Sequence, residues 1–332
     1  MIGLQFAIGA LILVLAAVKL AECGDAIAYH TNLGGMLIGV ILLASATSAP
    51  EILTMISSIN QNHIDLTAGD LFGSSMFNML LLGLLDMVFY RNRILRRVAL
   101  KHALTASLAT MLTGLAVFFI LSDIDVGIGW FGLDSLLMLA VYFAGIWLLR
   151  KDHARGARTK HVERERQPSD DTTPLPKAIL GFALAVGVLI VVVPSVVSSG
   201  AAIAQVSGLG DGFIGVVLIA GVTSLPELVA MIAAVRLGEY DMAVGNLFGS
   251  NMFNMFALAL ADFVFLQGRF LGSIDPVFAL AGLVAMLLTT LGLIGNLAHL
   301  ERRIWFVELD ALLLILGYLA GLYLLFSRGV GA

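Results

Sequence analysis

The sequence predicts an all-α membrane protein in which ten transmembrane helices form two inverted five-helix repeats. Hydrophobic residues make up 59% of the 332 residues and charged residues only 13%, whereas a soluble domain carries roughly 25% charge. The apolar residues form long blocks, each close to the ~20 residues that span a bilayer as a helix. In addition, residues 39–79 recur without a gap as residues 215–255, and about half of the paired positions are identical.

The predicted spans lie five on each side of one polar segment. They are 2–20, 34–60, 66–88, 101–121, 131–149, 177–198, 211–237, 242–266, 276–296 and 304–326. Residues 151–176 are rich in charge, Ser, Thr and Pro, so we expect them to form a cytoplasmic linker between a first repeat, 1–150, and a second repeat, 177–332. An odd number of spans in each half makes equivalent helices run in opposite directions. The first span lacks the basic start and cleavage site of a signal peptide, so we expect it to be retained.

Basic residues predict how the chain is oriented in the membrane. They gather after the third and fifth spans, at Arg91, Arg93, Arg96, Arg97 and Lys101 and at Arg150, Lys151, Arg155, Arg158 and Lys160. The loop between these two clusters carries Asp123 and Asp125 and no basic residue. Because basic loops stay in the cytoplasm, both termini are predicted to lie outside. The expected location is the cell (inner) membrane.

Each copy of the repeat carries a proline and a carboxylate in the middle of an apolar span. The motifs are Thr47-Ser-Ala-Pro-Glu51 and Thr223-Ser-Leu-Pro-Glu227. Proline lacks an N–H and its ring clashes with the carbonyl four residues earlier, so we expect the first of these helices to break near Ala46 to Ala49. Broken helices at matching places in two halves are the best sequence indication of a transporter's binding site.

Glu51 and Glu227 indicate a cation site, because a charge at the bilayer centre costs a few kcal/mol even on lenient scales (~2.5–3.5). Carboxylate, hydroxyl and freed carbonyl oxygens are hard ligands that suit calcium or sodium. The alternative is structural: Ser48 and Ser224 each stand three residues before the glutamate, as in the capping box that starts a helix.

The following spans supply partner side chains. Ser74 and Asn78 are four residues apart, as are Ser250 and Asn254, so each pair projects from one helical face. A glycine before each serine lets another helix approach closely. The alternative for these residues is helix packing held by small and amide side chains.

The paired motifs Thr-Ser-x-Pro-Glu and Gly-Ser-x-x-Phe-Asn resemble the repeats of the sodium/calcium exchanger family in the cation/calcium antiporter superfamily, particularly its short prokaryotic members. The resemblance implies exchange of Ca²⁺ for Na⁺ by alternating access, with the first and sixth spans sliding against the rest. It implies Glu51 and Glu227 as central ligands. The other implied ligands are Asn78, Asn254, Thr47, Ser48, Thr223, Ser224, Ser74 and Ser250, with backbone carbonyls from Ala44 and Ala220.

Two positions depart from this family's pattern. Asn254 stands where sodium-coupled members often have aspartate, which favours the alternative of H⁺-coupled exchange of Ca²⁺ or another divalent cation. Asp70 stands where members usually have asparagine, as Asn246 does in the second repeat. Asp70 is either a helix-start residue favoured by the dipole, a carboxylate at the mouth of the ion pathway, or a proton acceptor.

Other functions are less favoured. An intramembrane aspartyl protease would use Gly208-Leu-Gly-Asp211 and Tyr240-Asp241, but their order is reversed and both lie at span ends. A cation channel would usually need a ring of subunits. We expect no cofactor, no nucleotide and no nucleic acid. The expected partners are membrane lipid and the transported cations, Ca²⁺ with Na⁺ or H⁺, and a monomer is sufficient.

Overall fold

The computed structural model describes residues 1–30, 46–89, 102–159, 173–236, 238–298, 303–304 and 307–329. In this part of the chain nine helical stretches are long and apolar enough to cross a membrane. The first repeat holds α1 (Ile2–His30), α3 (Ala49–Asn60), α4 (Ile64–Val88), α6 (Ala103–Ser122) and α7 (Leu133–Thr159). The second holds α8 (Leu175–Ser207), α9 (Asp211–Ile214), the π-helix η1 (Gly215–Ile219), α10 (Ala220–Thr223), α11 (Leu225–Arg236), α12 (Tyr240–Val264), α13 (Phe270–Ser273), the 3-10 helix η2 (Pro276–Phe278), α14 (Ala279–Ala298) and α15 (Leu309–Ser327).

The predicted spans are confirmed where they can be compared, but three of them end too early. α1 continues to His30, α8 to Ser207, and α7 into the predicted linker as far as Thr159. Polar residues near the ends do not stop these helices. In α1, for example, Lys19 and Glu22 form an exposed ion pair of 2.8 Å at i,i+3 spacing, which supports a helix. Of the predicted span 34–60, residues 34–45 lie outside the described residues, as does the basic cluster at 91–101.

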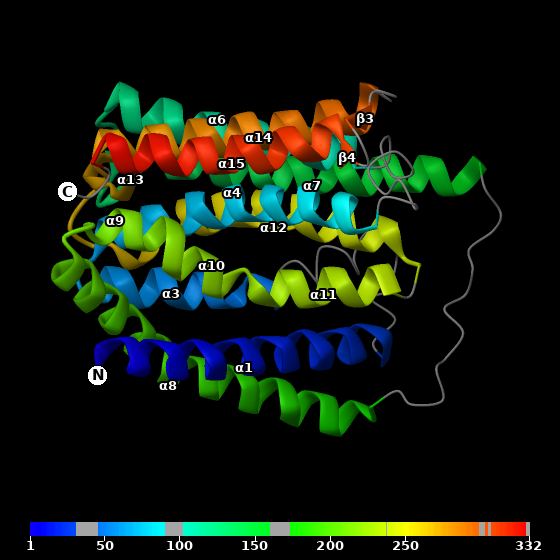
Figure 1. The fold of residues 1–332 in the computed structure, drawn as a ribbon, viewed down its shortest axis with the longest axis horizontal. Coiled ribbons are helices and arrows are strands. Elements are labelled where there is room, and N and C mark those ends of the chain that lie inside the picture. Colours follow the sequence, from blue (N-terminus) through cyan, green and yellow to red (C-terminus); the bar gives the residue numbers. More distant parts are fainter. Residues whose placement is uncertain are drawn as a thin grey trace.

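The helices α4 and α12 form the centre of the bundle (Figure 1). Of an 18-residue apolar stretch, 72% is buried in α4 and 78% in α12, against 22–56% in the other described spans. On one side of this centre lie α6, α7, α14 and α15; on the other lie α3 and the run α9–α11. Because α4 and α12 are largely buried by other helices, they can carry polar side chains at membrane depth.

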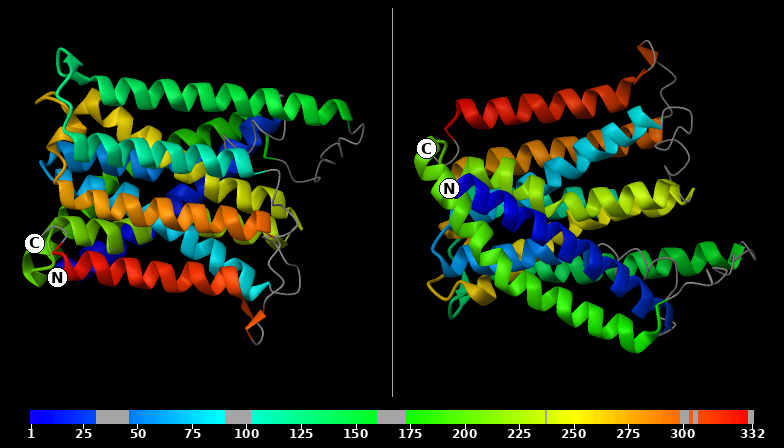
Figure 2. Two further views of the ribbon diagram at one scale, coloured as in Figure 1. Left: turned by 90° about the horizontal axis from the view of Figure 1, so that it is seen from above. Right: turned by 60° about the horizontal axis from the view of Figure 1, so that its bottom comes forward.

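The pair α1 and α8 lies at the outer edge of the bundle, below α3 and α11 in Figure 1 and in front in the right view of Figure 2. The two helices pack mainly on each other, and the apolar cluster around Leu13, Leu20, Leu189 and Val193 extends to Leu66 of α4 and Ile219 of η1. The start of α1 and the end of α15 lie at one end of the bundle.

The repeat extends beyond the motifs into the loops. A short hairpin of β1 (Gly127–Ile128) and β2 (Phe131–Gly132) precedes α7, and a second of β3 (Arg303–Ile304) and β4 (Val307–Glu308) precedes α15. In the first hairpin Gly127 pairs with Gly132 and Ile128 with Phe131; in the second, Arg303 pairs with Glu308 and Ile304 with Val307. Each residue of the second hairpin therefore follows its equivalent by 176 positions, which is also the spacing between Ser75 and Asn251 in the two repeats.

An ion-pair cluster ties the end of α12 to the loop before α7. The Arg269 side chain is 7% exposed and contacts Asp134 at 3.2 Å and Asp123 at 2.5 Å. Asp262 accepts hydrogen bonds from the backbone N–H groups of Gly132 and Phe270, at 2.8 and 2.5 Å. These contacts fix the loops at one end of the bundle around the central helix.

Candidate functional site

Both repeated motifs break a helix where the sequence predicts. Ser224 separates α10 from α11 with φ −87° and ψ 4°, and Ser48 precedes α3 with φ −88° and ψ 11°. Pro50 and Pro226 follow in the first turn of the new helix, where a missing N–H costs nothing. The predicted break between residues 46 and 49 is therefore confirmed.

The central helix α4 packs backbone against backbone on the segment before the second break. A Cβ on Gly69 would lie 2.3 Å from the carbonyl oxygen of Gly212, and one on Gly73 would lie 2.7 Å from the Cα of Val216. Only glycine permits this approach. The facing segment, η1, is a π-helix, a rare form that is frequent at functional sites. The packing brings the polar face of α4 against α10.

Glu227 collects hydroxyl groups from both repeats. Its Oε1 accepts hydrogen bonds from Ser48 Oγ at 2.9 Å and Ser250 Oγ at 3.2 Å, and the two hydroxyls lie 3.1 Å apart. Ser48 makes no capping hydrogen bond to α3, and Ser224 Oγ has no partner among the described residues. The capping-box alternative is therefore wrong: the first serine serves the carboxylate of the other repeat.

A second carboxylate with hydroxyl partners lies on α4. Thr223 Oγ1 donates to Asp70 Oδ1 at 3.0 Å, and Ser74 Oγ lies 3.3 Å from Thr223 Oγ1. The equivalent contact in the other half joins Thr47 Oγ1 to Asn246 Oδ1 at 3.4 Å. Asp70 lies in the second turn of α4 and is 0% exposed, beyond the first turn in which the helix dipole acts. The contact with Thr223, and not the helix dipole, therefore accounts for the buried position of Asp70.

The two asparagines are oriented by the helix opposite each of them. Asn78 Nδ2 donates to Asn251 Oδ1 at 3.0 Å, and Asn254 Nδ2 donates to Ser75 Oγ at 3.3 Å. Asn251 is held in turn by Thr289 at 3.2 Å. Because the NH₂ groups are used, the carbonyl oxygens of Asn78 and Asn254 remain without a partner among the described residues.

The sequence interpretation missed Ser75 and Asn251 as positioning residues. They are equivalent positions, and both are polar within apolar spans, which is the signal that would have identified them. Asn246, the partner of Thr47, carries the same signal.

Every predicted ligand within the described residues is at most 1% exposed. Ala220 contributes a carbonyl that accepts from Ser224 N at 3.1 Å and lies 3.3 Å from Thr223 Oγ1. Ala44 lies outside the described residues. Glu51 is buried beside the cluster, and its charge repels those of Glu227 and Asp70.

Several buried oxygens at this place lack a hydrogen-bond partner among the described residues. They are Glu51 Oε2, Glu227 Oε2, Asp70 Oδ2, Asn78 Oδ1, Asn254 Oδ1 and Ser224 Oγ. A buried acceptor without a partner costs about 1–3 kcal/mol, and more when charged. A donor set made only of carboxylate, amide and hydroxyl oxygens fits a hard cation.

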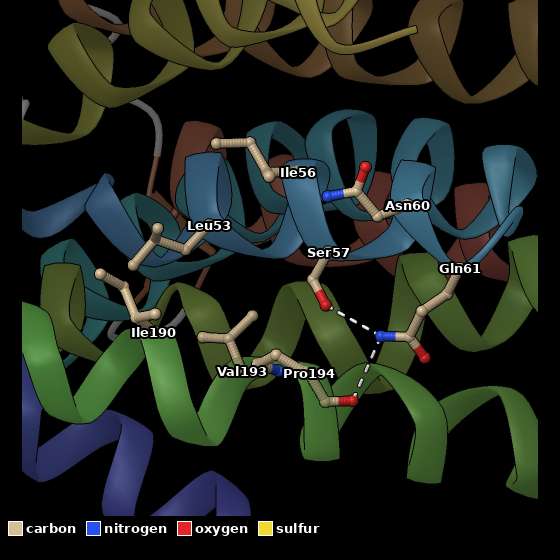
Figure 3. A pocket seen from close by; sticks show the side chains of 8 residues that line it. All are labelled: Leu53, Ile56, Ser57, Asn60, Gln61, Ile190, Val193 and Pro194. Carbon is tan, nitrogen blue, oxygen red and sulfur yellow. Dashed lines mark hydrogen bonds between the residues drawn. The ribbon is translucent and has the colours of Figure 1, made fainter.

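A separate cleft of about 380 Å³ lies between α3 and α8 (Figure 3). It is lined by Leu53, Ile56, Ser57, Asn60, Gln61, Ile190, Val193 and Pro194. Gln61 Nε2 donates to Ser57 Oγ at 2.9 Å and to the carbonyl of Pro194 at 3.3 Å. The lining residues of α3 follow a helical period that places them on the face opposite Glu51. The cleft is therefore not the cluster of carboxylates.

The protease alternative fails on geometry. Asp211 begins α9 and Asp241 follows α11, so a 26-residue helical run separates them. At 1.5 Å per residue this run spans roughly 39 Å. The two aspartates cannot form a catalytic pair.

Comparisons with known proteins agree with this picture. The family model described as "Sodium/calcium exchanger protein" matches residues 2–150 and 177–327. The inner membrane protein YrbG of Escherichia coli (strain K12) is 30% identical over 261 residues, 75% of each chain. The sodium-calcium exchanger NCX_Mj, soaked with Na⁺ and Ca²⁺, has a TM-score of 0.58 at 21% identity over 96% of each chain. The H⁺/Ca²⁺ exchanger CAX has a TM-score of 0.66 at 12% identity, over 99% of this chain and 89% of its own.

The fold of both solved exchangers is thus the fold of this chain, and the family model covers both of its halves. The chain belongs to the sodium/calcium exchanger protein family and is an integral membrane cation antiporter, not an enzyme.

Proposed function

We propose that the protein exchanges Ca²⁺ for Na⁺ across the membrane by alternating access, at a site centred on Glu51 and Glu227. The observation that carries the proposal is the set of buried, unpartnered oxygens around these two glutamates. Ligands of this kind are provided by carboxylates, hydroxyls and amides in protein calcium sites. The proposed ligands are those named from the sequence, with Asn78 and Asn254 supplying their oriented carbonyls.

The arrangement of charges explains why transport would be an exchange. Two buried carboxylates that lie close together repel each other, and an empty, charged site is costly at membrane depth. One divalent cation or several monovalent cations would neutralise them, but both together would overcharge the site. The protein would therefore change its open side when it is occupied and not when it is empty.

Sodium is the proposed coupling ion, and H⁺-coupled exchange is the rival. Asn254 leaves Glu51 and Glu227 as the charges of the central four residues, which favours H⁺. Asp70, however, adds a third carboxylate in contact with Thr223, which provides charge for more than one sodium ion. Solved exchangers of both kinds share this fold, so the fold does not distinguish the two.

The pair α1 and α8 is the proposed moving part. Its apolar cluster is distinct from the main core but also includes Leu66 of α4 and Ile219 of η1, and apolar contacts of this kind allow sliding at a small cost. Gln61 and the carbonyl of Pro194 provide a polar link between α3 and this pair. We place the protein in the cell (inner) membrane with both termini outside, and regard one chain as sufficient because both repeats contribute to one cluster.

The test is uptake of calcium-45 into proteoliposomes that contain the purified protein. One set of vesicles is loaded with sodium and another is given a pH gradient. Each is repeated with Glu51→Gln, Glu227→Gln and the control Glu22→Gln, whose side chain is 59% exposed on α1. We expect sodium-driven uptake that both site variants abolish and the control retains. Uptake driven only by the pH gradient would establish the H⁺-coupled rival, and no uptake in either set would reject calcium as the substrate.

A further inference from the structure

Thr289 of α14 is linked to the candidate site although none of the proposed ligands lies on that helix. Its hydroxyl accepts a hydrogen bond from Asn251 Nδ2 of α12 at 3.2 Å. Asn251 Oδ1 in turn accepts from Asn78 Nδ2 of α4 at 3.0 Å. Each of the three side chains is 1% exposed. A buried chain of hydrogen bonds therefore crosses three helices and ends on a proposed ligand, Asn78.

The hydrogen bonds of Thr289 fix the direction of this chain. A threonine hydroxyl has one hydrogen, and Thr289 donates it to the carbonyl of Ala285 at 2.8 Å, so its lone pairs face Asn251. The Nδ2 group of Asn251 also donates to the backbone carbonyl of Ser75 at 3.2 Å, which is another acceptor. Both acceptors hold the NH₂ group of Asn251 on this side, and its carbonyl oxygen therefore faces Asn78.

This direction decides what Asn78 presents to a cation. Asn78 gives its NH₂ group to Asn251, and Asn78 Oδ1 has no partner among the described residues. If the Asn251 amide turned over, its NH₂ group would face Asn78, which would then turn its own carbonyl to Asn251 and its NH₂ group away. An amide NH₂ group is a donor and cannot coordinate a cation. The orientation of one buried amide thus determines whether the next one is a ligand.

The equivalent threonine of the first repeat has no such link. Thr113 precedes Thr289 by the same 176 positions that separate the two repeats at Ser75 and Asn251. It is 2% exposed and donates to the preceding turn of its own helix at 2.8 Å, as Thr289 does. The first repeat has Ser75 at the position of Asn251, and within the described part of the chain no hydrogen bond joins Thr113 to Ser75. The chain therefore contains its own matched comparison.

We propose that Thr289 is a positioning residue for the cation site: its hydroxyl orients Asn251, and through Asn251 it keeps the carbonyl oxygen of Asn78 available to the transported cation. The inference rests on the proposed function, in which Asn78 is a ligand, and extends it to a helix that supplies no ligand. Loss of the hydroxyl lowers the affinity of the site for the cation. It leaves the movement between the two open sides, and so the maximal rate, nearly unchanged.

Three variants separate this role from packing. Thr289→Val keeps the shape of the side chain and removes the hydroxyl, Thr289→Ser keeps the hydroxyl, and Thr113→Val makes the first change at the equivalent position. Each purified protein is assayed in proteoliposomes for the calcium concentration of half-maximal calcium-45 exchange and for the maximal rate. Independently, thermal unfolding in detergent is followed as calcium, or separately sodium, is added, because a bound ligand raises the unfolding temperature.

We expect Thr289→Val to raise the calcium concentration of half-maximal exchange by about threefold to tenfold, with little change in the maximal rate. The calcium-dependent rise in unfolding temperature should shrink accordingly. Thr289→Ser and Thr113→Val should retain the calcium dependence of the unchanged protein. In an Asn251→Ala background, Thr289→Val should alter the calcium dependence no further, since the effect passes through that amide.

An unchanged calcium dependence in Thr289→Val, or an equal change in Thr113→Val, would overturn the proposal. A fall in the maximal rate alone, or a full additional loss in the Asn251→Ala background, would do the same. If the unchanged protein responds to calcium in neither assay, the proposed calcium exchange fails, and the sodium-dependent unfolding then tests Thr289 by the same comparison. A protein that responds to neither ion would have no cation site for Thr289 to position, which rejects this inference as well.

Discussion

Ser48 of the first repeat donates a 2.9 Å hydrogen bond to Glu227 of the second. The residues are 179 positions apart, and the contact joins two motifs that are themselves copies of each other. The cluster therefore joins the two repeats, although Glu227 also accepts from Ser250 of its own repeat.

Removing this hydroxyl should weaken calcium binding. A hydrogen bond to a charged group contributes about 1.5–3 kcal/mol, so Ser48→Ala should raise the calcium concentration for half-maximal exchange by about tenfold or more. Ser198→Ala is the control, because Ser198 is exposed and its hydroxyl donates to the carbonyl of Ser195. Equal calcium dependence in the two variants would contradict a role of Ser48 at the site.

Ser75 should matter through Asn254. Its Oγ accepts a hydrogen bond from Asn254 Nδ2 and donates one to the Leu71 carbonyl at 3.0 Å. Ser75→Ala removes the acceptor that orients the Asn254 amide, so it should weaken calcium binding. In an Asn254→Ala background the same change should have little further effect, since residues in contact couple by about 0.5–3 kcal/mol. Thr110→Ala removes a similar bond to the preceding turn, at a residue for which the described part of the chain offers no amide partner, and should leave calcium dependence unchanged. Additive effects of the Ser75 and Asn254 substitutions would argue against this positioning role.

Gly69 should not tolerate a side chain. The Cβ of Gly69→Ala would lie 2.3 Å from a backbone oxygen, which cannot move without shifting the segment before η1, and overpacking typically costs about 1–3 kcal/mol. The measurement is the thermal unfolding midpoint in detergent. Gly187→Ala on α8 has nothing within 4 Å of the added Cβ and should not lower that midpoint. A Gly69→Ala protein as stable as Gly187→Ala would show that the close approach is not required.

Arg269 should be needed for stability. Arg269→Gln leaves the Asp134 carboxylate, which is 1% exposed, without its cation, and breaking a buried pair costs about 3–5 kcal/mol. Lys19→Gln breaks a pair that is 59% exposed on both sides, where ion pairs contribute only about 0.2–1 kcal/mol. The unfolding midpoint should therefore fall far more for the first variant, and similar midpoints would contradict the assigned role.

The sequence was sufficient for the spans, the inverted repeats and the gathering of polar residues, because hydroxyls and carboxylates in apolar blocks are visible without a structure. It could not show that Ser48 meets Glu227, since a repeat reveals which positions are equivalent but not which ones touch. The role of Ser75 was hidden for a related reason: its partner Asn254 comes from the other half. The end of α1 was misplaced because a helix continues past its last apolar residue when polar side chains such as Lys19 and Glu22 can pair with one another. The end of α8 was misplaced because residues 199–207 are still largely apolar and continue the helix to Ser207.

Asp70 and Asn246 make the two halves of the cluster chemically unlike. An inverted repeat is a rotation that interchanges the two sides of the membrane, and a perfectly repeated chain would present the same chemistry to each compartment. Ions arriving from either side of the membrane would then meet the same ligands. One carboxyl in place of an amide removes that equivalence, so an ion arriving from one compartment meets a charge that an ion arriving from the other does not. The two sides of the cluster therefore differ chemically, while the direction of net exchange remains set by the ion gradients.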